Sequence, residues 1–259
     1  MVHPPPPRQR ASPEPRPGDP AGAIRGCREA DAGFREDCLA CCLRALANCA
    51  DGAAQLNALD WRSIHPVFFN AGAFLFHQGD LGVSLYSLRS GLLKLVQYQP
   101  NGTERIVRLQ KKGGMAGLEA LVCEHYHHSA IAVRGVDACR IPTGLIQRIR
   151  AAVPPFDTLL LQRWQQDIDL ADYWICQFAT GSTAARVARL LLFLVEFGEL
   201  EPGVAVQLLS RHDMAGMLGV TCESVCRMIS HFRQAGLIQR ASQDLYQCDV
   251  PALQRIAAG

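Results

Sequence analysis

The sequence predicts an α+β protein in which a small antiparallel β sandwich or barrel is followed by one long helix and then by a winged helix-turn-helix. Three observations support this order. Short β-type runs punctuated by glycine occupy residues 61–142, an amphipathic stretch starts at residue 154, and two short helical patterns around a glycine precede strand-like runs near the end. The 259 residues suffice for two domains, since a domain commonly has about 100 to 200.

The overall composition limits the classes of protein that the chain can represent. It is 49% hydrophobic and 19% charged, with a formal net charge of +2. These values exclude general disorder and a surface that is basic throughout, so any contact with nucleic acid must be local. No apolar run approaches the roughly 18 residues of a membrane span, and the first twenty residues hold eight prolines rather than an apolar signal core. We therefore expect a cytoplasmic protein.

The first 54 residues divide into two segments. Residues 1–26 consist largely of Pro, Arg and Gly and predict a disordered tail, because they hold too little apolar material to form a core. Residues 27–54 hold five of the eleven cysteines. The cytosol keeps thiols reduced, so this density indicates metal, cluster or redox chemistry rather than a disulfide framework.

Residues 55–150 carry the β-type pattern. Runs such as PVFFNAGAFLF, SLYSLRSGLLKLVQY and ERIVRL recur about every ten residues with turn signals between them, as in a small antiparallel sandwich or barrel. Asn101-Gly102 lies between two of these runs and is the strongest hairpin signal in the chain.

Residues 154–181 predict a long amphipathic helix that begins at Pro154-Pro155. Its apolar positions alternate three and four residues apart, which is typical of a two-stranded coiled coil and predicts a homodimer. The acids Asp167, Asp169 and Asp172 flank this seam, so we expect the dimer to persist whatever happens to the cysteines. The alternative is a helix that packs on its own domain. The predicted seam consists of Leu161, Trp164, Ile168, Ala171, Ile175 and Phe178.

Residues 182–259 fit a winged helix-turn-helix. With Arg211 as the first residue of the motif, the positions that the helix-turn-helix geometry restricts carry residue types that fit them. Ala215 stands at the close crossing, Gly219 at the tight turn, and Val225 and Met228 on the inward face of the second helix.

The second helix of this motif would be a recognition helix. Thr221 is a good N-cap, and the first turns would present Cys222, Glu223, Cys226 and Arg227 to a major groove. A carboxylate there can accept from cytosine N4 while the guanidinium donates to guanine O6 and N7, so the two can read one G·C pair. The alternative is an ordinary ion pair between side chains four residues apart.

Three segments resemble the Crp/Fnr family of bacterial transcription regulators: GAFLFHQGD at 72–80, LYSLRSGLLKL at 85–95 and ESVCR at 223–227. The resemblance implies a cyclic-nucleotide-binding-type jelly roll, a dimerisation helix and a winged helix-turn-helix that binds palindromic DNA and works with RNA polymerase. In the Fnr branch the motif E-x-x-S-R reads TTGAT-type half-sites. Cys226 replaces that serine here, which leaves the predicted G·C contact intact.

The resemblance also bears on the signal. Nucleotide-binding members have a G-E-L segment and a later Arg-Ser pair, where this chain has Gly117-Leu118-Glu119 and His128-Ser129, so no cyclic nucleotide is expected. The Fnr branch instead holds a four-iron four-sulfur cluster on four cysteines, whose places are taken here by Cys38, Cys41, Cys49 and Cys139.

Several alternatives stay open at this point. Cys42 competes with Cys49 as the third ligand, and a regulator without a cluster would respond through thiols, zinc or haem. A cupin-like metalloenzyme would need further ligands after the histidines at 125–128. Those ligands are missing, so we expect no enzyme.

Overall fold

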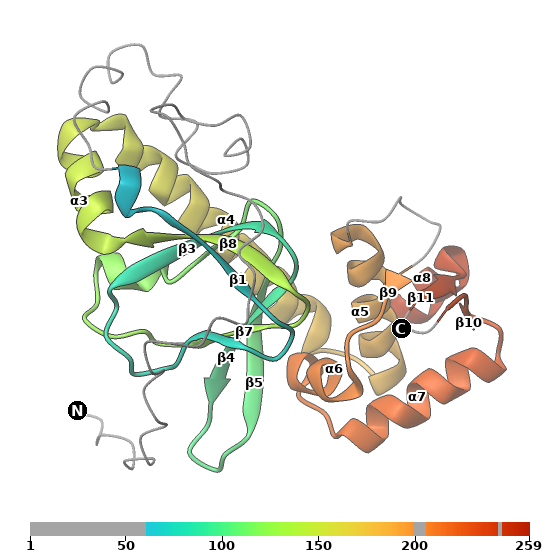
Figure 1. Ribbon diagram of the computed structural model, residues 1–259. Coiled ribbons are helices and arrows are strands. Elements are labelled where there is room, and N and C mark those ends of the chain that lie inside the picture. Colours follow the sequence, from blue (N-terminus) through green and yellow to red (C-terminus); the bar gives the residue numbers. More distant parts are fainter. Residues whose placement is uncertain (1–60, 199–205, 243–244) are drawn as a thin grey trace. The chain divides into compact units, whose positions relative to one another are not determined.

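The computed structural model describes residues 61–198, 206–242 and 245–259, and it divides the chain into two compact units (Figure 1). The second consists of Pro154–Gly259 together with Lys94–Gln97 and Arg105–Leu109, and the first holds the other residues up to Val153. The predicted α+β fold is confirmed. Cys38, Cys41 and Cys49, together with the predicted tail, lie outside the described residues. Within the described ranges, no helix is long and apolar enough to cross a membrane.

The first eight strands form a β sandwich made of two four-stranded sheets, with strand orders β1-β8-β3-β6 and β2-β7-β4-β5. The non-consecutive neighbours are those of a jelly roll rather than a simple meander. The strands are β1 His65–Phe69, β2 Phe74–Phe76, β3 Ser84–Ser90, β4 Leu93–Tyr98, β5 Glu104–Gln110, β6 Met115–Ala116, β7 Ser129–Ala132 and β8 Val136–Pro142.

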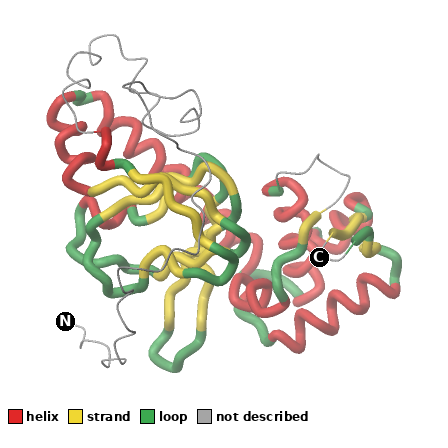
Figure 2. Tube along the Cα trace, viewed as in Figure 1, coloured by secondary structure: helices red, strands yellow, loops and turns green. Residues whose placement is uncertain are grey.

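The core of the sandwich contains an aromatic cluster between the two sheets. The ring of Phe76 lies 3.8 Å from that of Tyr126 and 5.8 Å from that of Tyr86, measured between centroids. The predicted hairpin at Asn101-Gly102 is confirmed, because β4 and β5 are neighbours and Gly102 adopts the left-handed φ of 81° that such a turn requires. Figure 2 shows these two strands joined by their loop.

Three short helical segments of the first unit were not predicted from the sequence. They are η2 Trp61–Ser63, η3 Leu118–Leu121 and α3 Thr143–Ala152. Helix α3 follows β8 directly and buries Leu145, Ile146 and Ile149 on one face, with i, i+1 and i+4 spacing.

The long helix α4 spans Pro155–Phe178 and starts with the predicted proline. Its faces differ in exposure. Leu161, Ile168 and Ile175, seven residues apart, are 66%, 45% and 64% exposed. Trp164 and Ala171 are half-buried, whereas Asp167 and Phe178 are buried. The acid Asp167, which the sequence places beside the seam, is therefore buried.

The second unit is mostly helical, with a small three-stranded sheet ordered β10-β11-β9. The strands β10 and β11 form the predicted wing, and the terminal helix α8 was not predicted. The elements are α5 Thr183–Phe197, β9 Val206–Gln207, α6 Arg211–Leu218, α7 Cys222–Gln234, β10 Ile238–Arg240, β11 Leu245–Cys248 and α8 Val250–Ala257.

An aromatic cluster joins α4 to α5. The Phe178 ring lies 5.6 Å from Trp174 and 5.8 Å from Phe193, and Phe193 stacks on Phe197 at 4.9 Å. Phe178 is 2% exposed, so the structure places it in this core and not on the exposed stripe of α4. The end of the long helix is thus part of the helix-turn-helix unit.

Candidate nucleic-acid interface

Helix α6 is defined by a cap at each end. The Ser210 hydroxyl accepts from the Asp213 amide at 3.0 Å and donates to the Asp213 carboxylate at 2.7 Å. The helix ends at Gly219, whose φ of 62° and ψ of 42° are left-handed, as predicted for the tight turn. Ala215 is buried in α6, where its small side chain permits a close helix crossing.

Helix α7 begins where the N-cap was predicted. The Thr221 hydroxyl accepts from the Ser224 amide at 3.2 Å. The inward face consists of Val225, Ile229 and Phe232, each at most 2% exposed and spaced by four and three residues. The prediction for Met228 was wrong in part, since this side chain is only half-buried and Ile229 fills the inward position.

The outward face of α7 carries the candidate base-reading residues. Thr221, Cys222, Glu223, Cys226 and Arg227 are all exposed. Within the described part of the chain, neither Glu223 nor Arg227 takes part in an ion pair, so the ordinary helix-surface pair is not formed. Both charged groups are available to a ligand.

Two thiols lie beside these charges. Cys222 and Cys226 are both exposed and lie four residues apart on α7. Desolvation, together with the neighbouring Cys226 thiol, raises the pKa of the Cys222 thiol from its ordinary value. The Cys222 thiol therefore stays protonated at neutral pH.

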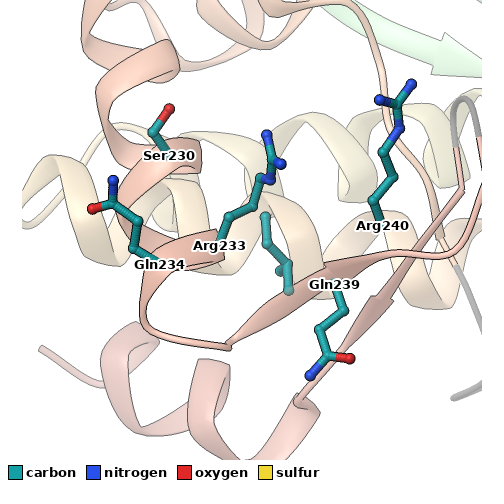
Figure 3. A pocket seen from close by; sticks show the side chains of 6 residues that line it. Ser230, Arg233, Gln234, Gln239 and Arg240 are labelled. Carbon is teal, nitrogen blue, oxygen red and sulfur yellow. The ribbon is translucent and has the colours of Figure 1, made fainter.

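A hollow lies between the second half of α7 and strand β10 of the wing (Figure 3). Its volume is about 470 Å³, and all of its lining residues except Ile238 are polar. In Figure 3 the guanidinium groups of Arg233 and Arg240 project to one side of the wing and Gln239 to the other. Two cations beside a recognition helix suit the phosphates of a nucleic-acid backbone. The lining residues are Ser230, Arg233, Gln234, Ile238, Gln239 and Arg240.

These lining residues were not predicted from the sequence. The available signal was the excess of arginine over acids within 211–240, which indicated a basic region but not which side chains share a face. Arg233 and Arg240 belong to different elements, and only the folded wing brings them together.

Two arginines of α5 hold the ends of the surrounding helices. Arg186 donates from Nε to the Phe178 carbonyl at 2.5 Å and from a terminal nitrogen to the Leu218 carbonyl. Arg189 donates to the carbonyls of Ala257 at 2.8 Å and Gln177 at 3.2 Å. Carbonyls at helix C-termini lack intrahelical donors and carry partial negative charge, so a guanidinium is well matched to them. Arg186 thereby ties the end of α4 to the end of α6.

Cys139 is the one candidate metal ligand within the described residues. It lies in β8 opposite Pro66 and Ser87 and is 8% exposed. The next residue, Arg140, is paired with Tyr86, whose ring contacts the second sheet through Phe76. Successive side chains alternate between faces, so Cys139 faces away from the second sheet. Within the described ranges no group of three or more potential ligands could hold a metal ion.

The positions that the resemblance relates to nucleotide binding carry internal polar contacts. His128 Nδ1 lies 3.4 Å from Glu119 Oε1, with both side chains largely buried. The Ser129 hydroxyl accepts a hydrogen bond from the backbone amide of Gln78 at 2.9 Å.

Comparisons with known proteins agree with this architecture. Residues 66–152 match the cyclic nucleotide-binding domain family, and residues 185–256 match the Crp-like helix-turn-helix domain family. The transcriptional activator protein Anr of Pseudomonas aeruginosa is 27% identical over 191 residues, which are 73% of this chain and 78% of Anr.

Two solved structures extend the comparison to the fold. FixK2 of Bradyrhizobium japonicum has a TM-score of 0.68 at 16% identity, covering 76% of this chain and 98% of its own. A Crp/Fnr-family transcriptional regulator of Thermus thermophilus has a TM-score of 0.62 at 26% identity, covering 75% and 99%.

A jelly roll followed by a winged helix-turn-helix with an exposed second helix defines a DNA-binding transcription regulator. The chain belongs to the Crp/Fnr family of transcription regulators, as its two domain matches and its relatives establish. Members of this family are not enzymes, which confirms the expectation drawn from the missing cupin ligands.

Proposed function

We propose that this chain is a homodimeric regulator that responds to oxygen or redox state through a four-iron four-sulfur cluster and binds palindromic, TTGAT-like promoter DNA. The observation that carries the DNA-binding half is the capped, exposed start of α7, where Glu223 and Arg227 have no ion-pair partner among the described residues. Working at promoters implies the cytoplasm as location and RNA polymerase as partner.

The two charged side chains of α7 supply complementary contacts to one base pair. Arg227 donates to guanine O6 and N7, and Glu223 accepts from cytosine N4 on the other strand. A carboxylate is tolerated this close to phosphates because the cytosine amino group is its partner. Arg233 of α7 and Arg240 of the wing contact phosphates and set the register without reading sequence.

The test compares specific and random DNA. Arg227→Ala should lose about 1–3 kcal/mol of specific binding and relax the preference for guanine, and Glu223→Ala should relax discrimination at the same base pair. Affinities are measured by fluorescence anisotropy at one fixed salt concentration. If Arg227→Ala weakens random and specific DNA equally, the base-reading role is wrong.

The proposed cluster ligands are Cys38, Cys41, Cys49 and Cys139. Thiolates are the donors that iron-sulfur clusters require, and the cluster would supply oxygen-labile redox chemistry. Cys139 is the member of this set that lies within the described residues, on the face of β8 that strand alternation places away from the second sheet, and it is 8% exposed. Cys42 remains the alternative to Cys49.

Protein purified without oxygen tests the cluster. We expect iron, acid-labile sulfide and visible colour, all lost in serine variants of the four ligands and retained in Cys176→Ser. Stoichiometric zinc without sulfide would refute the cluster and favour the zinc alternative. Loss of the cluster in Cys42→Ser but not in Cys49→Ser would reassign the third ligand.

No cyclic nucleotide takes part in this proposal. Glu119 faces His128 where a phosphate partner would stand, and the chain has no arginine at that position. Calorimetric titration with cyclic AMP should give no saturable heat. Micromolar binding would mean that the His128-Glu119 pair opens to admit the phosphate.

A further inference from the structure

The recognition helix carries a pair of thiols that the proposed reading of DNA does not use. Cys222 and Cys226 are four residues apart, so they lie one above the other on the same face of α7. Both are exposed. Each precedes one of the proposed base-reading residues, Glu223 and Arg227.

The spacing of these thiols opposes a disulfide. Residues four apart on a helix have Cβ atoms about 5–6 Å apart, whereas a disulfide needs about 3.5–4.5 Å. A disulfide would therefore require the first turn of α7 to open. A single atom bonded to both sulfurs makes the bridge between the two thiols one bond longer than a disulfide. It can therefore join them without opening the first turn of α7.

The number and kind of donors indicate which atom this is. Structural zinc takes four ligands, and no group of three potential ligands occurs in the described ranges. A trivalent arsenic centre, by contrast, is held firmly by two thiols. The raised pKa of Cys222 adds to this preference, because a divalent metal must displace thiol protons whereas an arsenic oxide consumes them as water.

We propose that Cys222 and Cys226 form a dithiol site for trivalent arsenicals on the DNA-reading face of α7, and that its occupation lowers specific DNA affinity. The regulatory half of this inference rests on the proposed function. With phenylarsine oxide as the probe, two S–H bonds and the arsenic-oxygen bond break, two arsenic-sulfur bonds form, and one water leaves. No oxidant or reductant is needed.

The consequence for DNA binding follows from position. The bridged group stands beside Glu223 and Arg227 on the first two turns, where the helix must approach base edges. A bulky substituent there keeps both side chains from their hydrogen-bond distances. Loss of one bidentate contact corresponds to about tenfold or more in specific affinity.

The test counts bound arsenic by native mass spectrometry of the full chain. The chain has eleven cysteines, so the comparison is differential. Cys226→Ser should bind one phenylarsine oxide fewer per chain than the unmodified protein, and so should Cys222→Ser. Cys176→Ser is the matched control, because Cys176 is an exposed cysteine on α4, and it should bind the same number as the unmodified protein.

DNA affinity is the second measurement, with each protein compared with its own untreated state. The probe should reduce specific affinity about tenfold in the unmodified protein and in Cys176→Ser, with recovery on addition of a small dithiol. Cys226→Ser should lose this response. Equal arsenic counts in all proteins, or equal loss of affinity in Cys226→Ser, overturns the inference. Absence of specific binding before treatment overturns the proposed function instead, while the arsenic count still tests the dithiol site.

Discussion

Arg186 offers the sharpest test of how the long helix is joined to the DNA-binding motif. Its guanidinium donates to the last carbonyl of α4 at Phe178 and to the last carbonyl of α6 at Leu218. Arg186→Met keeps a long unbranched side chain with good helix propensity and removes only the donors. The two carbonyls then lose their charged partner.

The expected cost follows from the number and kind of these bonds. A hydrogen bond to a charged group contributes about 1.5–3 kcal/mol net to stability. Arg186 is half-buried, so each hydrogen bond contributes an energy near the lower end of that range. Two such bonds give a loss of about 3 kcal/mol for the second unit. Desolvation lowers the pKa of this guanidinium, which nevertheless stays charged at neutral pH.

Urea unfolding followed by tryptophan fluorescence measures this loss, since Trp174 lies in the aromatic cluster of the same unit. With a slope of about 1–3 kcal/mol per molar, the midpoint should fall by about 1–3 M. The matched control is Arg255→Met on the exposed side of α8, which should change stability by less than about 0.5 kcal/mol. Equal midpoints for the two variants would refute the role of Arg186 as a tie between helices.

Three further predictions concern the wing and the dimer helix. Burial raises the pKa of the Cys248 thiol to about 11, so between about pH 9 and 11 the folded state keeps its proton while the unfolded state ionises. The free energy of unfolding should therefore fall over this pH range. Cys248→Ala should flatten that decline, as measured by urea midpoints. Arg240→Ala should weaken specific and random DNA alike and reduce the salt slope of binding by about 0.9, and a changed base preference would contradict a phosphate contact. Ala171→Asp should make dimerisation conditional, and sedimentation showing an unchanged dimer would argue against a seam on this face of α4.

The sequence predicted those features that depend on local chemistry. Alternation with turn residues located the strands of the sandwich, and Asn101-Gly102 identified its hairpin, because a left-handed turn needs these residue types. The helix-turn-helix was found for the same reason, since a cap at Thr221 and a glycine at 219 are required by backbone geometry alone.

The errors arise where tertiary packing or helix rotation decides. Phe178 was assigned to the seam on a period of 3.5 residues, but a straight helix turns about 20° per heptad away from that repeat. After two heptads the position has rotated onto the buried face, where Phe193 receives it. The place of Arg240 beside Arg233 was not predicted, because the two residues lie in different elements and only the folded structure brings them to the same hollow.

The same rotation changes the expectation for the dimer. The exposed stripe of α4 runs through Leu161, Ile168 and Ile175, and Asp172 lies four residues after Ile168 and three before Ile175. Residues at these spacings are neighbours on a helix surface, so Asp172 borders the stripe more closely than a strict heptad indicates. Two copies that pair through the stripe must either keep this carboxylate hydrated or cover it at a cost. A signal that shifts α4 by part of a turn would alter that balance, and because Arg186 ties the end of α4 to the end of α6, it would also reach the first helix of the helix-turn-helix.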